Sequence, residues 1–264
     1  MVDIDGTLLD KNGAICVEDR KALARVAGSG IRVSLSTGRV VQACLKIIEQ
    51  LSLDGCHIFF DGALVANPTT GQEIYVEPIS PELVRRLIEF ARLTGLDLEL
   101  YSATHYFIER ETWATEIRQQ FFDLQPTMTD FAQIWPQERI IKGTLTASSG
   151  EEKAKASVIY QQFRTLLSFS WTKTPAYPDI DFINVLACDV SKGKAMEALA
   201  SHLAIPLSET MAIGDGANDV SLLSRAGFAV AMENAADEVK AVADYVTLDV
   251  DHNGVAAAVA RFLV

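Results

Sequence analysis

The sequence predicts an α/β fold with a parallel sheet, interrupted by an α+β insert. Apolar runs at 31–35 and 57–60 enclose an amphipathic stretch at 40–51, which is the strand, helix, strand order of a parallel sheet. That order resumes near residue 211. Between 77 and 187, several runs instead alternate polar with apolar residues, a pattern typical of an antiparallel sheet with one solvated face.

The segment after residue 188 is expected to complete the parallel sheet. Its apolar and amphipathic stretches alternate in the order strand 211–213, helix 219–226, strand 228–231, helix 235–243 and strand 245–248. Asn234 is expected to cap the helix that begins at 235, because its side chain can accept a hydrogen bond from an N–H of the first turn. The predicted core domain therefore comprises residues 1–76 and 188–264.

The insert, residues 77–187, is expected to open with a helix. Ser80 suits the N-cap, Pro81 the first helical position and Gly95 the C-cap. The β-like runs that follow lie at 98–101, 106–109, 140–147, 168–174 and 181–186. A chain of 264 residues is long enough for a core domain and a smaller inserted one.

Composition restricts the partners of the chain. Hydrophobic residues make up 49% and charged residues 22%, which is ample material for a packed core. The formal net charge of -12 argues against nucleic acid or an anionic membrane surface as a partner, since clusters of Lys and Arg bind both. The same charge would repel a phosphorylated metabolite unless a cation reversed the sign locally, so a metal ion is expected.

The chain has the features of a cytoplasmic protein. Its four cysteines are scattered without a CxxC pair, so reduced thiols are expected. No signal peptide opens the chain, and no apolar run approaches the roughly 20 residues of a membrane helix. A cytoplasmic location is expected.

Two acidic segments follow predicted strands. Asp3 and Asp5 lie two residues apart where a buried strand would end, and such a pair suits a nucleophile and an acid/base; the alternative is a capped turn. Asp215, Asn218 and Asp219 lie between a predicted strand and a predicted helix, at the edge where parallel sheets bind ligands. Their oxygen atoms can ligate Mg²⁺, although an acidic turn would look similar.

A phosphate site is indicated by two further segments. Thr37, Gly38 and Arg39 end one predicted strand and open a helix, so a hydroxyl and backbone N–H groups converge where an anion can bind; an ordinary helix cap is the alternative. Lys192 precedes the helical stretch 195–203 and could bring an ammonium group to a phosphate oxygen, although most lysines simply face solvent.

Together these segments resemble, in order and spacing, the motifs of the haloacid dehalogenase superfamily of phosphatases, and more narrowly its Cof-type branch. The matching residues are Asp3-Ile-Asp5-Gly-Thr-Leu-Leu, Ser-Thr37-Gly38-Arg39, Asp61-Gly-Ala-Leu-Val, Lys192-Gly193 and Gly-Asp215-Gly-Ala-Asn218-Asp219. The stretch from Ala226 to Gly254 also looks like that branch. The resemblance spans both halves of the predicted core.

The resemblance implies a Rossmann-like core that holds the site and an inserted α+β cap at 77–187 that closes over the substrate. Asp3 would attack phosphorus and ligate Mg²⁺; Asp5 would protonate the leaving alcohol, activate water and bind the metal through its carbonyl. Asp215 would complete the metal ligands. The supporting residues would be Thr37, Gly38, Lys192 and Asn218 on the phosphate, Arg39 on the substrate, and Asp219 orienting these groups. The implied reaction is hydrolysis of a small phosphomonoester, such as a sugar phosphate, through an aspartyl-phosphate.

Two departures from the family pattern stand out. Only Met1 and Val2 precede Asp3, whereas relatives usually have a longer central strand. Either the true start lies upstream, which is the expectation, or the chain folds with a shortened strand under Asp3. Asp61 stands where the branch commonly has Asn, which places an extra carboxylate near the site.

Several alternatives stay open. A sugar phosphomutase would use the same nucleophile and acid/base pair, and a sensor could bind phosphate without turnover; a dehalogenase would not need the acid at Asp5. Side chains of the insert could contact the substrate or simply pack, namely His105, Arg110, Trp113, Trp135, Trp171 and Tyr177. The sequence carries no signal for the oligomeric state.

Overall fold

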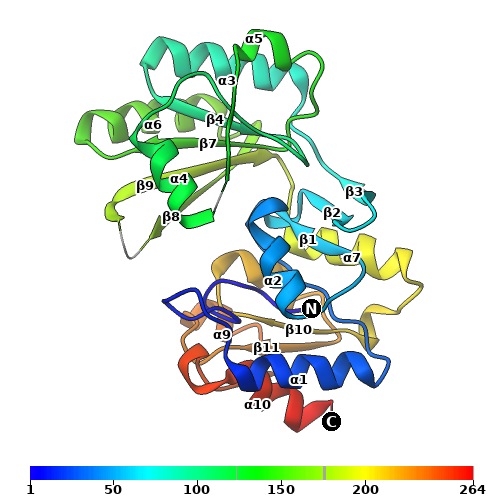
Figure 1. The fold of residues 1–264 in the computed structure, drawn as a ribbon. Helices are drawn as coiled ribbons and strands as arrows, with labels where there is room; N and C mark the ends of the chain where they lie inside the picture. The colour runs from blue at the N-terminus through cyan, green and yellow to red at the C-terminus, as the bar shows by residue number, and fades with distance from the viewer. Residues whose placement is uncertain (123, 175–176, 264) are drawn as a thin grey trace. The chain divides into compact units, whose positions relative to one another are not determined.

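The computed structural model describes residues 1–122, 124–174 and 177–263 (Figure 1). Contacts divide the chain into two compact units. Unit 1 comprises Met1–Arg39, Cys44–Tyr75 and Ser191–Val264, and unit 2 comprises Val40–Ala43 and Val76–Val190. The sequence pattern places residues 40–43 in a helix of the core, whereas the structure groups them with unit 2.

A row of parallel segments forms the centre of unit 1, as the sequence predicts. Strands β10 (Met211–Gly214), β11 (Phe228–Ala231) and β12 (Tyr245–Val246) pair in parallel. Val2 extends the row through parallel bridges to Ile213 and Leu35. Ser36 then bridges in parallel to β1 (His57–Phe59).

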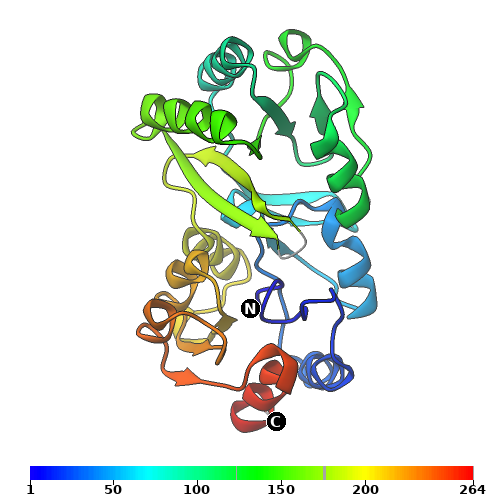
Figure 2. The ribbon, with the colours of Figure 1, turned by 90° about the vertical axis from the view of Figure 1, so that its left-hand side faces the viewer.

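The start of the chain contributes very few residues to this row (Figures 1 and 2). The Val2 N–H donates to the Ser34 carbonyl at 2.9 Å, and the Asp3 N–H donates to the Ile213 carbonyl at 3.0 Å. Val2 is buried among these neighbours. The central position of the sheet is therefore occupied by Val2, and Asp3 emerges directly at its carboxyl end.

Several elements of unit 1 are shorter than predicted. The run 31–35 is extended only as bridges at Leu35 and Ser36. The helices predicted at 40–51, 219–226 and 235–243 are also shorter. In that order, they are a 3₁₀ turn plus α2 (Leu45–Gln50), a 3₁₀ turn plus α8 (Val220–Leu223), and α9 (Asp237–Lys240). Apolar periodicity continues into the turns that flank these helices, so it cannot mark where helical backbone begins.

Helices and a short three-stranded sheet complete unit 1. Helix α1 (Val17–Gly28) packs against α10 (Gly254–Phe262), side by side in Figure 1. Helix α7 (Lys192–His202) packs against β1 and β2 (Leu64–Asn67). Strand β2 pairs with β1 in antiparallel fashion, and β3 (Gln72–Val76) follows it in the same sheet.

Asp19 joins α1 to α10 and makes stability depend on pH. Its carboxylate is 1% exposed; Oδ1 accepts a hydrogen bond from the Ala256 N–H at 2.7 Å, whereas Oδ2 has no partner among the described residues. Burial raises the pKa of Asp19 to about 6, against the opposing effect of that hydrogen bond. A raised pKa means that the folded state favours the protonated acid. Its stabilising effect is present below about pH 4 and lost as the pH rises through 6.

We therefore expect Asp19→Asn to remove a pH dependence of stability. As the pH rises from 4 to 7, the wild type should lose about 1–3 kcal/mol of unfolding free energy relative to Asp19→Asn. Urea titrations at several pH values would measure this difference. Glu49→Gln, which removes an exposed carboxylate from another helix of unit 1, is the control and should show no such trend. Parallel curves for Asp19→Asn and the wild type would contradict the prediction.

Unit 2 is an α+β domain, as predicted. Its six-stranded sheet has the order β6-β5-β4-β7-β9-β8 and is antiparallel except at β5–β6. The strands are β4 (Asp97–Tyr101), β5 (Tyr106–Ile108), β6 (Thr127–Met128), β7 (Lys142–Ala147), β8 (Leu167–Thr174) and β9 (Tyr177–Ala187).

Two helices, α3 (Pro81–Thr94) and α6 (Gly150–Phe163), share one apolar core with this sheet (Figures 1 and 2). The predicted ends of α3 are confirmed: the Ser80 side chain accepts a hydrogen bond from the Leu83 N–H, and Gly95 has the left-handed φ of 72°. Helices α4 (Trp113–Phe122) and α5 (Phe131–Ile134) complete the unit. No helix within the described ranges combines the length and apolar character needed to cross a bilayer.

Candidate active site

The predicted site residues of unit 1 gather at the carboxyl edge of the parallel row. Asp3 follows Val2, Thr37 follows Ser36, and Asp215 follows β10, so three neighbouring segments end at the same edge. Lys192 reaches this edge from the start of α7, where the Ser191 side chain caps the helix by accepting a hydrogen bond from the Lys194 N–H. Residues almost two hundred positions apart in sequence thus meet, as shown by the contact between Lys192 and Asp3.

Lys192 is a buried cation shared by two carboxylates. Its Nζ lies 2.6 Å from Oδ1 of Asp3 and 2.6 Å from Oδ1 of Asp219, and the lysine is fully buried. Burial alone would lower the pKa of Lys192, but the charges of Asp3 and Asp219 outweigh it and raise the pKa. The ammonium group is therefore charged at neutral pH.

One ammonium group does not neutralise two buried carboxylates. Burial and the neighbouring Asp219 raise the pKa of Asp3 well above its usual value, despite the opposing charge of Lys192. Oxygen atoms of Asp3, Asp215 and Asp219 all lie within 4.8 Å of one another. A divalent cation would neutralise this excess of negative charge, which is shielded from water. Carboxylate oxygens are the ligands that Mg²⁺ prefers.

Asp219 has both oxygens engaged. Oδ1 contacts Lys192, while Oδ2 accepts hydrogen bonds from the N–H groups of Asp215 and Gly216 at 3.1 and 2.9 Å. The carboxylate thereby fixes the loop that carries Asp215 as well as the lysine. Within the described residues, Asp3 has no donor on its other oxygen, so Asp3 is better placed than Asp219 to ligate a cation directly.

Asp215 is oriented by two side chains that sequence analysis did not assign to the site. The Thr7 hydroxyl donates to Oδ1 at 2.7 Å, and Nδ2 of Asn234 donates to Oδ2 at 3.2 Å. Burial raises the pKa of Asp215 to about 6. Gly6, with a φ of +85°, passes so close that an added Cβ would lie 2.3 Å from Oδ2 of Asp215.

The prediction that Asn234 caps a helix is wrong. Its Nδ2 also donates to the Gly6 carbonyl at 2.9 Å, and its Oδ1 accepts a hydrogen bond from the Val250 N–H at 3.1 Å. Ala236 takes the N-cap position of α9 instead, without a side-chain hydrogen bond. An Asn before an apolar stretch suits either role, and only the fold reveals that Asp215 is within reach.

Asp5 forms an ion pair with Arg39. Nε of Arg39 donates to Oδ2 of Asp5 at 2.8 Å and Nη2 donates to Oδ1 at 2.5 Å, a two-point contact. Burial would lower the pKa of Arg39, but the pairing with Asp5 raises it. The side chain of Arg39, which the resemblance assigns to the substrate, thus forms an ion pair with Asp5 in the structure.

The predicted phosphate-binding residues lie close together, but the expected helix N-terminus is absent. After Thr37 and Gly38 the chain reaches its first helical turn only at Gln42–Cys44. The buried Thr37 hydroxyl accepts a hydrogen bond from the Arg39 N–H at 3.1 Å, which shapes a turn instead. Nδ2 of Asn218 donates to Oδ1 of Asp61 at 2.7 Å, so the unusual Asp61 belongs to the site.

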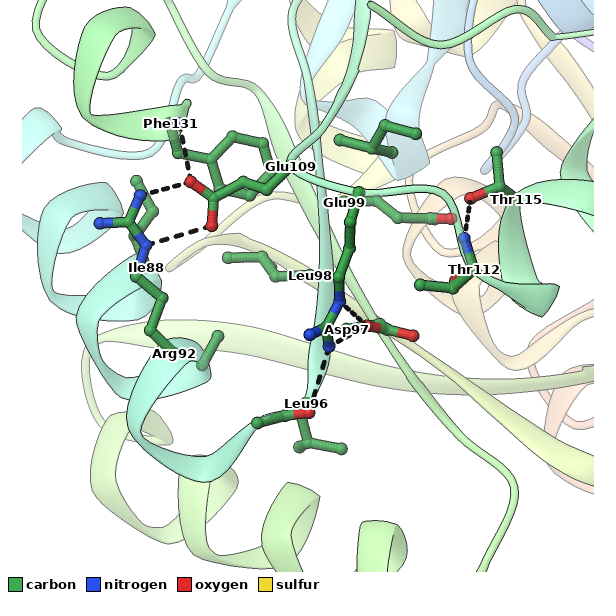
Figure 3. Close-up of a pocket in the computed structure, with 14 residues that line it drawn as sticks. Ile88, Arg92, Leu96, Asp97, Leu98, Glu99, Glu109, Thr112, Thr115 and Phe131 are labelled. Carbon is green, nitrogen blue, oxygen red and sulfur yellow. Dashed lines mark hydrogen bonds and ion pairs between the residues drawn. The ribbon is translucent and has the colours of Figure 1, made fainter. Parts of the chain in front are cut away.

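A separate pocket lies within unit 2 (Figure 3). It contains none of the predicted catalytic residues, and carboxylates hold both of its arginines. Arg92 contacts Glu109 and Asp130, and Nη2 of Arg110 lies 2.6 Å from Asp97. Its two arginines are thus already neutralised, which makes the pocket a poor phosphate site.

The other side chains of the insert proposed as ligand contacts mostly pack within unit 2. Trp135 lies against the core beneath α3 and α6, and Tyr177 lies against Ile117, Ile180 and Phe182. The remaining contacts are ring contacts of Trp171 with Tyr160 and of His105 with Phe107, while Trp113 is 36% exposed.

The chain resembles known phosphatases over nearly its full length. The family model for haloacid dehalogenase-like hydrolases matches residues 1–259. Phosphatase YwpJ of Bacillus subtilis (strain 168) is 28% identical over 274 aligned residues, covering 97% of this chain and 96% of the relative.

Solved structures show the same similarity. A haloacid dehalogenase-like hydrolase from Bacteroides thetaiotaomicron aligns with a TM-score of 0.86 and 25% identity, covering 99% of this chain and 98% of that one. A sugar phosphatase of HAD subclass IIB aligns with a TM-score of 0.79 and 27% identity, covering 99% and 97%.

Proposed function

The chain belongs to the haloacid dehalogenase-like hydrolase family and is a phosphatase of its Cof-type branch; we propose that it hydrolyses small phosphomonoesters with Mg²⁺ through a phosphorylated Asp3. One observation carries the proposal. Asp3 lies at the carboxyl end of the sheet, in contact with the buried Lys192, with carboxylate oxygens of Asp215 and Asp219 within 4.8 Å. This arrangement combines a nucleophile, a fixed cation and oxygen ligands for a metal.

The residues present fit a bound Mg²⁺. The carboxylates of Asp3 and Asp215 and the carbonyl of Asp5 would hold it, while Asp219 keeps Lys192 and the Asp215 loop in place. Bound there, Mg²⁺ would neutralise the repulsion between a phosphate and the excess carboxylates.

In the first step, a carboxylate oxygen of Asp3 forms a bond to phosphorus while the bond from phosphorus to the alcohol oxygen breaks. Asp5 must first leave its ion pair with Arg39 and take up a proton, and it then donates that proton to the departing oxygen. The ammonium of Lys192, the Thr37 hydroxyl and the Asn218 amide would hold the non-bridging oxygens, because positioning and charge neutralisation dominate phosphoryl transfer.

In the second step, Asp5 accepts a proton from a water molecule whose oxygen attacks phosphorus. The bond between phosphorus and Asp3 then breaks, which returns the Asp3 carboxylate and releases inorganic phosphate. Asp219 acts as a positioning residue, since both of its oxygens are occupied by Lys192 and by two backbone N–H groups.

The inserted unit is proposed to be the cap that selects the substrate, with the core formed by residues 1–76 and 188–264 and the cap by 77–187. The similarity to a sugar phosphatase supports sugar phosphates as the substrate class. A phosphomutase would share the same groups at Asp3 and Asp5, and a sensor would share the phosphate site. The presence of both Asp3 and Asp5 favours catalysis over simple binding, since a sensor would need only the residues that hold phosphate.

Release of inorganic phosphate tests the proposal. The chain is assayed against a panel of sugar phosphates and other phosphomonoesters, with Mg²⁺ or with excess chelator. We expect phosphate release with Mg²⁺ and a loss of at least about 100-fold with chelator, because the charge repulsion at the site is then uncompensated. Conversion of a sugar phosphate to its isomer without phosphate release would favour the mutase, and binding without either reaction would favour the sensor.

A further inference from the structure

Asp61 occupies a strained turn between two segments of the proposed phosphate site, one that carries Thr37 and one that carries Lys192. Phe60 and Asp61 have left-handed φ angles of 53° and 55°, and Gly62 follows with 103°. Non-glycine residues adopt such angles at a cost of about 1 kcal/mol or more each, so contacts must hold the turn. It is anchored by two backbone hydrogen bonds of 3.0 Å, from the Asp61 N–H to the Thr37 carbonyl and from the Phe60 N–H to the Arg39 carbonyl.

The other side of this turn lies against α7. A Cβ added to Gly62 would lie 2.3 Å from the Ser191 carbonyl oxygen and 2.8 Å from the Lys192 nitrogen. The turn is therefore packed directly between the Thr37 segment and the Lys192 segment. Its geometry sets where the Asp61 side chain can reach.

The Asp61 carboxylate lies among the groups proposed to hold phosphate. Oδ1 accepts the 2.7 Å hydrogen bond from Nδ2 of Asn218. A Cβ added to Gly38 would lie 2.7 Å from Oδ1 of Asp61, so the carboxylate rests against the Gly38 backbone. Its charge also raises the pKa of Lys192.

These contacts give Asp61 two separable effects. Its acceptor atom fixes the Asn218 amide, which would aim the second N–H of that amide at a bound phosphate. Its negative charge, in contrast, would repel the bound phosphate. Five described carboxylates belong to this network, namely Asp3, Asp5, Asp61, Asp215 and Asp219. Lys192, Arg39 and a divalent cation together carry four positive charges. One negative charge of the network is therefore left uncompensated.

We propose that Asp61 is a positioning residue that orients Asn218 while its negative charge weakens the binding of inorganic phosphate and so speeds release of the product. The proposal rests on the phosphatase function above. A neutral Asn at this position would keep the acceptor for Asn218 and remove only the charge. Asn also tolerates left-handed backbone at least as well as Asp, so the turn should be retained.

Calorimetric titration of inorganic phosphate into the Mg²⁺-loaded chain tests the proposal without any turnover. We expect Asp61→Asn to bind phosphate at least about tenfold more tightly than the wild type, because one unit charge a few ångströms away contributes on that order even when solvent screens it strongly. The constant for inhibition of turnover by phosphate should fall by the same factor. Asp54→Asn, which removes an exposed charge elsewhere in unit 1 and keeps its acceptor for the Gly55 N–H, should match the wild type.

Asp61→Gly separates the charge from the contact. Glycine accepts the left-handed turn but removes both the charge and the acceptor for Asn218, so its gain in phosphate affinity should be smaller than that of Asp61→Asn. Equal affinity in the two variants would overturn the positioning role, and a wild-type affinity in Asp61→Asn would overturn the effect of charge. If no ester is hydrolysed but Asp61→Asn still binds phosphate more tightly, the inference stands while the proposed function fails.

Discussion

Asp3→Asn is expected to abolish phosphate release while leaving the fold intact. The proposed reaction needs a carboxylate oxygen of Asp3 to form the bond to phosphorus, and an amide of the same shape is a far weaker nucleophile. Loss of a covalent nucleophile lowers kcat by roughly 10⁴-fold or more. The measurement is kcat for the preferred ester at saturating Mg²⁺, compared with the wild type.

Stability separates loss of chemistry from loss of structure in this variant. Burial and Asp219 raise the pKa of Asp3, so folding disfavours its ionised form. Asn removes that charge, while Lys192 keeps Asp219 as its partner. The thermal midpoint of metal-free Asp3→Asn should thus equal or exceed that of the wild type. Substantial turnover in a folded Asp3→Asn sample would show that Asp3 is not the nucleophile.

The elements that sequence reasoning located best are those with local chemical signals. Ser80, Pro81 and Gly95 mark the ends of α3 because capping and backbone freedom are properties of single residues. Strand β11 matches its predicted range, 228–231, because it is a short apolar run between turns. The helix expected over 40–51 was not found at that length, because residues 40–43 belong with unit 2, a long-range preference that local periodicity does not encode.

The residues of the candidate site also divide into those with a local sequence signal and those whose contacts depend on the fold. Asp3, Asp215 and Asp219 are predicted from their places after apolar runs and Lys192 from its place before a helical stretch, and the structure brings all four together. The contacts of Asn234 could not be predicted, because they depend on how its loop folds against Gly6 and Val250. Thr7 was part of a quoted motif, but nothing local indicates that its hydroxyl reaches Asp215.

Lys192→Met is expected to destabilise the chain more than any other single change considered. Methionine has similar length but no charge, so Asp3 and Asp219 would lose the buried cation 2.6 Å from each of them. Breaking a buried ion pair by removing one partner costs about 3–5 kcal/mol, because the remaining charge is left uncompensated. Urea unfolding of the metal-free variant at pH 7 would measure the loss.

Acid should partly rescue this variant, and that response identifies the cause. Without Lys192 the buried negative charge would be left uncompensated, so the penalty is largest at neutral pH and shrinks as falling pH protonates Asp3, whose pKa burial already raises. Lys194→Met, two residues along the same helix at an exposed position, is the matched control and should be nearly neutral at every pH. If Lys192→Met were as stable as Lys194→Met at pH 7, the buried ammonium could not be what balances the charges of Asp3 and Asp219, and the electrostatic basis proposed for the site would be wrong.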